Sequence, residues 1–150
     1  MQLTTWLHSL AATGDTFAAT ALRWALGLMI LPHGLQKTLG WFGGHGFQGT
    51  MGYLTGPVGA PWIFALLAIL AESVGGLMLL AGLGTRLAAL GVGGVMAVAI
   101  TQHWTNGFFM NWFGNQKGEG IEFHLLALGI VGALLILGGG KWSLDSLLAR

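Results

Sequence analysis

Long apolar runs, separated by short polar or glycine-rich stretches, dominate the chain. A bilayer core of about 30 Å requires about 20 apolar residues at 1.5 Å per residue, and four runs approach this length. They cover residues 17–39, 62–81, 86–104 and 121–138. Only residues 82–85 join the second run to the third, which predicts an antiparallel helical hairpin. We therefore expect an all-α, polytopic membrane protein, in which residues 1–150 form a single domain built as an antiparallel bundle of four transmembrane helices.

The composition favours lipid as the solvent of this chain. Of its 150 residues, 54% are hydrophobic and 7% are charged, with a mean hydropathy of +0.72. Soluble domains carry roughly 25% charged residues. The formal net charge of +1 is too small for a nucleic-acid-binding surface. Because the chain has no cysteine, it has no disulfide, thiolate metal site or iron–sulfur cluster, and we expect no intrinsic cofactor. Redox chemistry would need a bound molecule such as a quinone.

The basic residues predict an orientation for the bundle. Four spans place both termini on one side, here called face A, whose basic residues are Arg23, Arg86, Lys141 and Arg150. The opposite side, face B, carries Lys37 and Lys117. Cytoplasmic loops are enriched in Lys and Arg, so face A and both termini are predicted to be cytoplasmic, with the bundle in the cell membrane.

Aromatic and amphipathic segments agree with these span boundaries. Tryptophans are expected at the membrane–water interface, and six fall near predicted span ends: Trp24 and Trp142 at face A, and Trp41, Trp62, Trp104 and Trp112 at face B. Leu3, Trp6, Leu7 and Leu10 share one helical face, which predicts an interfacial helix at the N-terminus. Residues 143–148 allow a similar helix at the C-terminus. A frayed end is the alternative in both cases.

Ionisable residues within the spans gather in the half of the bundle next to face B. They are His33, Lys37, Glu72, His103, Glu122 and His124. Glu72 lies about 15 Å below Trp62 by helical rise. A charged carboxylate at the bilayer centre costs roughly 2.5 to 3.5 kcal/mol, so Glu72 should be protonated, face water, or pair with His33 or Lys37. His33 and Lys37 lie one helical turn apart, so one partner could meet both. The structural alternative is that Glu72 only joins the first two helices.

The remaining polar residues in or near the spans allow further expectations. Glu122 and His124 are two apart on a helix and face different ways, whereas Glu119 and Glu122 can share a face. The histidines are interpreted as hydrogen-bonding groups, and no metal site is predicted. Arg23 is expected to snorkel toward face A.

Two aromatic loops are predicted to lie over the polar half of the bundle. The first contains Trp41 and a GxGxxG pattern at residues 44–49, which follows a membrane helix and not a strand, so it does not indicate a dinucleotide site. The second, residues 105–120, contains Phe109. These loops either form a vestibule for a flat or lipidic ligand or anchor the chain among lipid headgroups. On the vestibule interpretation, the candidate ligand-binding residues are His103, Glu119, Glu122, Trp41 and Phe109.

Sequence blocks along most of the chain occur in the order of a known family. They are RWALG at 23–27, PHGLQK at 32–37, WFGG at 41–44, AESVGG at 71–76, GLGTR at 82–86, the Phe108–Phe109 stretch leading to Glu119 and Glu122, and GGKWSLD at 139–145. This ordered set resembles the DoxX family over residues 22–148. The resemblance implies a small four-helix integral membrane protein.

The resemblance defines the fold more narrowly than the reaction. DoxX relatives include a subunit of a thiosulfate:quinone oxidoreductase and proteins linked to quinone or catechol stress, whereas more distant relatives are cargo receptors. We expect an accessory or quinone-binding subunit of a membrane redox system that receives electrons from partner proteins and is not an autonomous enzyme. His33 and Glu72 would exchange protons with the ligand and Lys37 would stabilise negative charge, which makes these three the candidate catalytic residues. The alternatives are a small-molecule or lipid transport component, working as a homo-oligomer, and a membrane scaffold.

Overall fold

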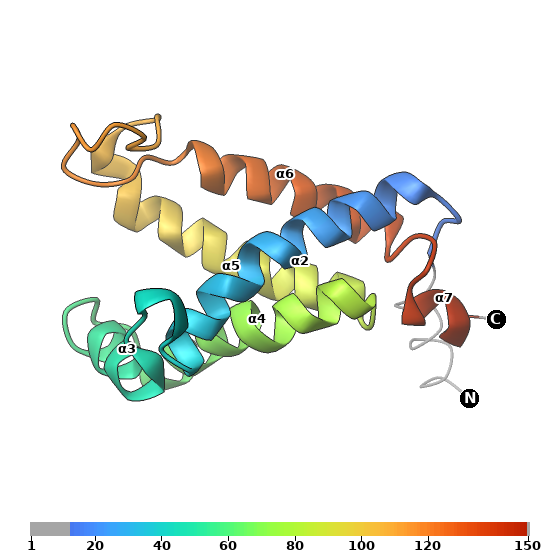
Figure 1. Ribbon diagram of the computed structural model, residues 1–150, viewed down its shortest axis with the longest axis horizontal. Helices are drawn as coiled ribbons and strands as arrows, with labels where there is room; N and C mark the ends of the chain where they lie inside the picture. The colour runs from blue at the N-terminus through green and yellow to red at the C-terminus, as the bar shows by residue number, and fades with distance from the viewer. Residues whose placement is uncertain (1–12, 150) are drawn as a thin grey trace.

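The computed structural model describes residues 13–149, and its long helices follow the predicted apolar runs (Figure 1). The long helices are α2 (Phe17–Thr38), α4 (Trp62–Ala81), α5 (Thr85–His103) and α6 (Glu122–Leu137). The short ones are η1 (Trp41–Gly43), α3 (Gly46–Thr55), η2 (Trp104–Asn106) and α7 (Leu144–Leu148). The described part of the chain contains no strand, so its all-helical class is confirmed. The predicted N-terminal interfacial helix and Arg150 lie outside the described residues.

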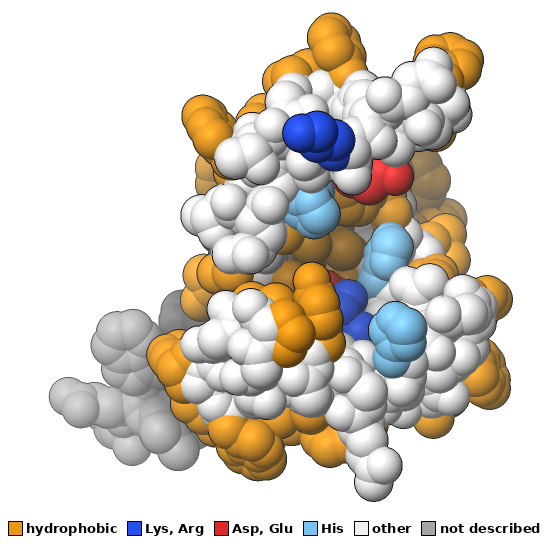
Figure 2. Space-filling model, turned by 90° about the vertical axis from the view of Figure 1, so that its left-hand side faces the viewer, with side chains coloured by type: hydrophobic (Ala, Val, Ile, Leu, Met, Phe, Trp, Pro, Cys, Tyr) orange, Lys and Arg blue, Asp and Glu red, His pale blue; other side chains and the backbone are white. Residues whose placement is uncertain are grey.

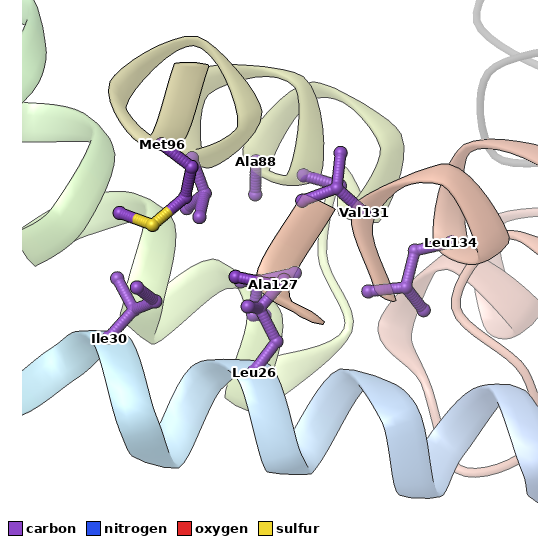
Figure 3. Packing of buried hydrophobic residues seen from close by; sticks show 10 residues of the cluster. Leu26, Ile30, Ala88, Met96, Ala127, Val131 and Leu134 are labelled. Atoms are coloured by element: carbon purple, nitrogen blue, oxygen red, sulfur yellow. The ribbon is translucent and has the colours of Figure 1, made fainter. Parts of the chain in front are cut away.

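The long helices form one bundle with two different ends. Helix α2 packs along α4, α4 packs against α5, and α5 packs against α6. Helix α7 lies at the face A end, while α3 and the loop between α5 and α6 lie at the face B end (Figure 1). The core between the four long helices is apolar (Figure 3), and its buried residues are Leu26, Ile30, Leu79, Ala88, Ala89, Val92, Met96, Ala127, Val131 and Leu134.

Helices α2 and α4 touch backbone to backbone where they cross. A methyl group added to Gly34 would lie 2.5 Å from the Cα atom of Ser73, and one added to Gly76 would lie 3.1 Å from the Cα atom of Leu31. Such contacts require glycine, because any side chain would push the helices apart. The crossing therefore holds the segment around Glu72 against the C-terminal half of α2.

The surface of α4 is more apolar than its buried face. Its exposed side chains include Ile63, Phe64, Leu67, Leu70, Val74 and Leu77, whereas its buried residues are Ala65, Ile69, Glu72, Ser73, Gly75, Gly76 and Leu79. A helix on the surface of a water-soluble protein shows the reverse arrangement. Large apolar side chains are exposed on the other long helices too, among them Leu28, Leu87, Leu90, Val98, Leu125, Leu126 and Ile136. This surface is suited to contact with lipid.

Two helical segments of the described chain are long and apolar enough to cross a membrane. They are Trp62–Ala81, with 20 residues, and Thr85–Asn106, with 22 residues, the latter combining α5 with η2. Helix α6 is apolar but has only 16 residues. Length and composition therefore support two of the four predicted spans.

The segment between α2 and α4 contains a helix that the pattern of apolar residues did not predict. In α3, Met51 and Leu54 pack against Ala65 and Ile69 of α4. Glycines within and next to α3 weaken the helical signal of this segment, since glycine disfavours helix by about 1 kcal/mol relative to alanine. The tertiary contact with α4 stabilises the helix instead. At the C-terminus, the predicted short helix is present as α7.

Candidate functional site

An ion pair joins α2 to the middle of α4 in the polar half of the bundle. The Lys37 ammonium donates to the Glu72 carboxylate oxygen Oε2. The Glu72 side chain is 5% exposed and that of Lys37 is 28% exposed. His33 and Lys37 were the two expected partners of Glu72, and the structure shows that Lys37 is the partner. Because Lys37 is partly exposed, its ammonium group can contact Glu72 and solvent or a ligand at the same time.

His33 has a different partner from Lys37, so the two residues do not share one carboxylate, although their spacing would allow it. Its Nδ1 atom lies 3.1 Å from Oε1 of Gln36, and the Gln36 amide nitrogen donates to the Phe42 carbonyl over 3.2 Å. His33 is exposed, whereas Glu72 is buried beside the helix crossing. The long lysine side chain reaches that buried carboxylate, while the imidazole stays at the surface one turn away.

The face B end of the bundle is hollowed (Figure 2). Lysine, histidine and acidic side chains are visible around the hollow, between the part formed by α5, α6 and their loop and the part formed by α2 and α3. Apolar side chains lie deeper inside it. The ionisable residues that the sequence contributes to this end are His33, Lys37, His45, Glu72, His103, Lys117, Glu119, Glu122 and His124. Polar groups and an apolar interior within one concavity are typical of sites for small organic ligands.

Two histidines of the face B half lie against each other. The rings of His103 and His124 are stacked, with centroids 5.1 Å apart and planes at 24°. His124 is buried, and its Nδ1 atom has no hydrogen-bond partner among the described residues. Buried polar atoms are nearly always hydrogen-bonded, so this nitrogen has unused capacity for a water or a ligand. No three His, Cys, Asp or Glu side chains within residues 13–149 form a group that could hold a metal ion.

Glu119 and Glu122 contact the loop between α5 and α6. The Glu119 carboxylate accepts a hydrogen bond of 2.8 Å from the Asn111 backbone N–H, and Glu122 accepts one of 3.3 Å from the indole of Trp112. Glu119 precedes α6, which begins only at Glu122, so the two carboxylates do not share a helix face as their spacing would allow. Each carboxylate instead fixes one of two consecutive loop residues.

The two aromatic candidates for ligand binding are both exposed. Trp41 is 57% exposed and packs edge-on against Phe42, with ring centroids 6.4 Å apart. Phe109 is 68% exposed and packs in the same way against Phe108 at 5.2 Å. These exposed rings fit either a ligand vestibule or the headgroup region of a bilayer.

Comparison with known proteins identifies the family. The DoxX family model matches residues 18–112, which begin at the second residue of α2, continue through α5 and include the Lys37–Glu72 pair. The chain belongs to the DoxX family. No curated protein and no solved structure matches it. Together with the two long apolar helices, membership of DoxX makes the chain a membrane protein.

At face A, this DoxX protein contains a buried arginine that was expected to snorkel. Arg23 is instead fully buried, so that prediction is wrong. Its guanidinium donates to four backbone carbonyls: Gly139 at 2.9 Å, Leu79 at 2.6 Å, Leu80 at 2.7 Å and Trp142 at 3.1 Å. The last carbonyls of a helix have no partner within it and carry partial negative charge. The C-terminal end of α4 and the loop after α6 therefore bind the arginine inside the protein.

Asp145 of the DoxX chain is a structural residue that the sequence interpretation missed. It is buried in α7, and its two carboxylate oxygens accept hydrogen bonds from the backbone N–H groups of Gly84, at 2.7 Å, and Thr85, at 2.9 Å. These groups begin α5, where N–H groups lack helical partners and an anion is favoured. The only available signal was the acidic residue in the block GGKWSLD, because nothing in the local sequence links it to α5.

Proposed function

We propose that this DoxX protein is a four-span membrane protein whose face B hollow binds a quinone, and that it acts as an accessory subunit of a membrane redox system. The observation that carries the proposal is the Lys37–Glu72 pair, in which Glu72 is buried and Lys37 is partly exposed, in the half of the bundle whose end is hollowed (Figure 2). Desolvation makes a buried ion pair a poor source of stability. Ionisable residues inside a membrane usually serve function.

The proposal of four spans rests on how the long helices pack. Helices α4 and α5 qualify as spans by length and composition, and α2 and α6 pack against them. Leu28 of α2 and Leu126 of α6 are exposed, as expected for helices in contact with lipid.

The proposed orientation places face A and both termini in the cytoplasm. The Lys37 charge is paired with Glu72, so Lys117 is the remaining basic residue of face B. Face A has Arg86 and Lys141 in the described residues, which favours the cytoplasmic side by the positive-inside rule. Trp24 and Trp142 are exposed at face A, and Trp62 and Trp104 at face B, as expected for two interfacial belts.

The groups in the polar half suit a ring ligand that carries oxygen substituents. Lys37 has three N–H donors, so the bond to Glu72 leaves capacity for a ligand oxygen. Glu72 can hold or release a proton beside it, and His33 lies one turn away on the same helix. When bound, a quinone supplies reversible electron and proton chemistry, and partner proteins supply the electrons. His124, whose Nδ1 atom has no hydrogen-bond partner among the described residues, is a further polar group in this half.

The test is a binding titration of the purified protein in nanodiscs with a short-chain quinone. We expect Glu72→Gln to weaken binding at least tenfold, which corresponds to about 1.4 kcal/mol. Asp15→Asn is the matched control, because it also converts an acid to its amide but removes an exposed ion pair with Lys141 at face A. This control should bind within about twofold of the wild type, since exposed ion pairs contribute little energy.

Three outcomes would contradict the quinone proposal. Equal quinone binding by wild type and Glu72→Gln would show that Glu72 does not contribute to the binding site. Folded wild type that binds no quinone but moves a small acid or lipid across proteoliposomes would favour a transport component. Loss of folding in Glu72→Gln, without a binding defect in the folded fraction, would favour a scaffold.

A further inference from the structure

Gln36 lies between the candidate proton-exchanging residue His33 and the turn that follows α2. Its amide nitrogen Nε2 donates to the Phe42 carbonyl at 3.2 Å, and its amide oxygen Oε1 lies 3.1 Å from Nδ1 of His33. One side chain therefore connects the backbone of η1 to the imidazole at the edge of the polar half.

The two contacts of Gln36 determine where the proton of His33 lies. A backbone carbonyl can only accept a hydrogen bond, so the NH₂ group of Gln36 must face Phe42 and its oxygen must face His33. An amide oxygen also only accepts, so Nδ1 of His33 must carry the hydrogen. A neutral imidazole has one N–H, and the hydrogen bond made by one nitrogen sets the state of the other. Nε2 is consequently an acceptor.

The surroundings of Gln36 keep its amide in this orientation. Phe42, whose carbonyl receives the bond, has a φ of 53°, which places a non-glycine residue in the left-handed region. This conformation persists only when neighbouring contacts hold it. Gly44 packs directly on the Gln36 backbone, closely enough that a Cβ atom would clash with it. The turn and the amide therefore support each other.

We infer that Gln36 is a positioning residue that holds His33 as the Nδ1–H tautomer, so that the site prefers a hydroxyl-bearing ring, a quinol or phenol, over the carbonyl form. The inference rests on the proposed function, since it assigns His33 to the ligand. No hydrogen bond from the described residues reaches Nε2, so its lone pair is available. A hydroxyl group can donate to that lone pair, whereas a quinone carbonyl cannot.

The tautomer is measured by ¹⁵N NMR of histidine-labelled protein in nanodiscs at about pH 8.5, where imidazole is neutral. His33→Asn assigns the signal. We expect Nδ1 of His33 to be protonated in the wild type and Gln36→Leu to shift the population toward Nε2–H, the form preferred by free histidine. The His103 signal, from the end of α5, should not change. An Nε2–H form in the wild type, or no response to Gln36→Leu, would overturn the inference.

A conservative variant separates the tautomer from the integrity of the turn. Gln36→Glu keeps an acceptor for the Nδ1–H group but loses the donor to Phe42. We expect the Nδ1–H form to persist in Gln36→Glu, even where the turn is loosened. A shift to Nε2–H in this variant would mean that the turn, and not the acceptor, sets the tautomer.

Ligand preference is tested with three forms of one probe: a 2-alkyl-1,4-naphthohydroquinone kept anaerobic, the corresponding quinone, and the hydroquinone dimethyl ether. The wild type should bind the hydroquinone about fivefold more tightly than the other two, as expected for one net hydrogen bond. Gln36→Leu should lose this preference. Equal binding of hydroquinone and quinone by the wild type would refute the preference while leaving the proposed function intact. Failure to bind all three would refute the proposed function, while the NMR result still decides the tautomer.

Discussion

The two ends of the bundle both bury charged side chains, but they satisfy them in different ways. At face A, Arg23 donates to four backbone carbonyls and Asp145 accepts from two backbone N–H groups. In the face B half, whose end is hollowed (Figure 2), Lys37 and Glu72 pair with each other, side chain to side chain. Backbone partners are fixed by the fold, whereas side-chain partners can exchange for a ligand. Burial of charge alone therefore does not identify a binding site. A buried charge with backbone partners is interpreted as structural, and one with a side-chain partner as a candidate for ligand binding.

The largest effect is expected from Arg23→Ala. The substitution removes donors from four carbonyls in a buried region, so we expect a loss of at least about 3 kcal/mol in the free energy of unfolding. Thermal unfolding in detergent measures this loss. The stability of Arg23→Lys should lie between that of wild type and that of Arg23→Ala. Lysine keeps the positive charge but lacks the planar fork that reaches several carbonyls. A melting temperature equal to that of wild type would mean that face A does not hold the fold.

The next effect concerns the crossing of α2 and α4. In Gly34→Ala the added methyl group would lie 2.5 Å from Ser73, so the helices must separate, at a cost of about 1 to 3 kcal/mol. The same shift should weaken quinone binding, because it moves α2 relative to Glu72. Gly94→Ala is the matched control, since no atom lies within 4 Å of the added methyl group. Gly94→Ala should be neutral or stabilising. Equal effects of both variants would refute the role of close packing.

The smallest of these effects is expected from Asp145→Asn. An amide keeps one acceptor for the start of α5 but loses the second acceptor and the negative charge, so we expect a loss of about 1 kcal/mol in stability. Chemical unfolding measures it, with Asp15→Asn as the exposed control. Quinone affinity should stay within about twofold of wild type. A large loss of quinone affinity in Asp145→Asn would contradict the assignment of face A to stability and face B to ligand binding.

Much of the fold was predictable from the sequence, because the four long helices coincide with apolar runs. Helix α3 was not, since glycines hide its pattern and its stability depends on contacts of Met51 and Leu54 with α4. The burial of Arg23 was not predictable either. An arginine near a helix end can either extend toward the membrane surface or donate to nearby backbone carbonyls. Which of these occurs depends on how closely the loop after α6 approaches the arginine.

The candidate site was predictable as a region but not as a set of contacts. Topology alone gathers His33, Lys37 and Glu72 in the face B half. The choice of Lys37 as the partner of Glu72 depends on how α2 crosses α4 at Gly34, which sequence spacing does not define. The role of Gln36 depends on the backbone of η1 and was likewise invisible in the sequence.

The central claim is that the buried charges at face A stabilise the fold, whereas the ionisable residues at face B bind the ligand. The most direct test is the amount of quinone that co-purifies per folded molecule, measured by mass spectrometry on wild type, Arg23→Lys and Glu72→Gln. Arg23→Lys should give less folded protein with a near wild-type quinone content. Glu72→Gln should fold nearly as well as wild type, because the partly exposed Lys37 stays hydrated, and its quinone content should fall at least tenfold. A quinone content that falls equally in both variants, or is absent from folded wild type, would contradict the account.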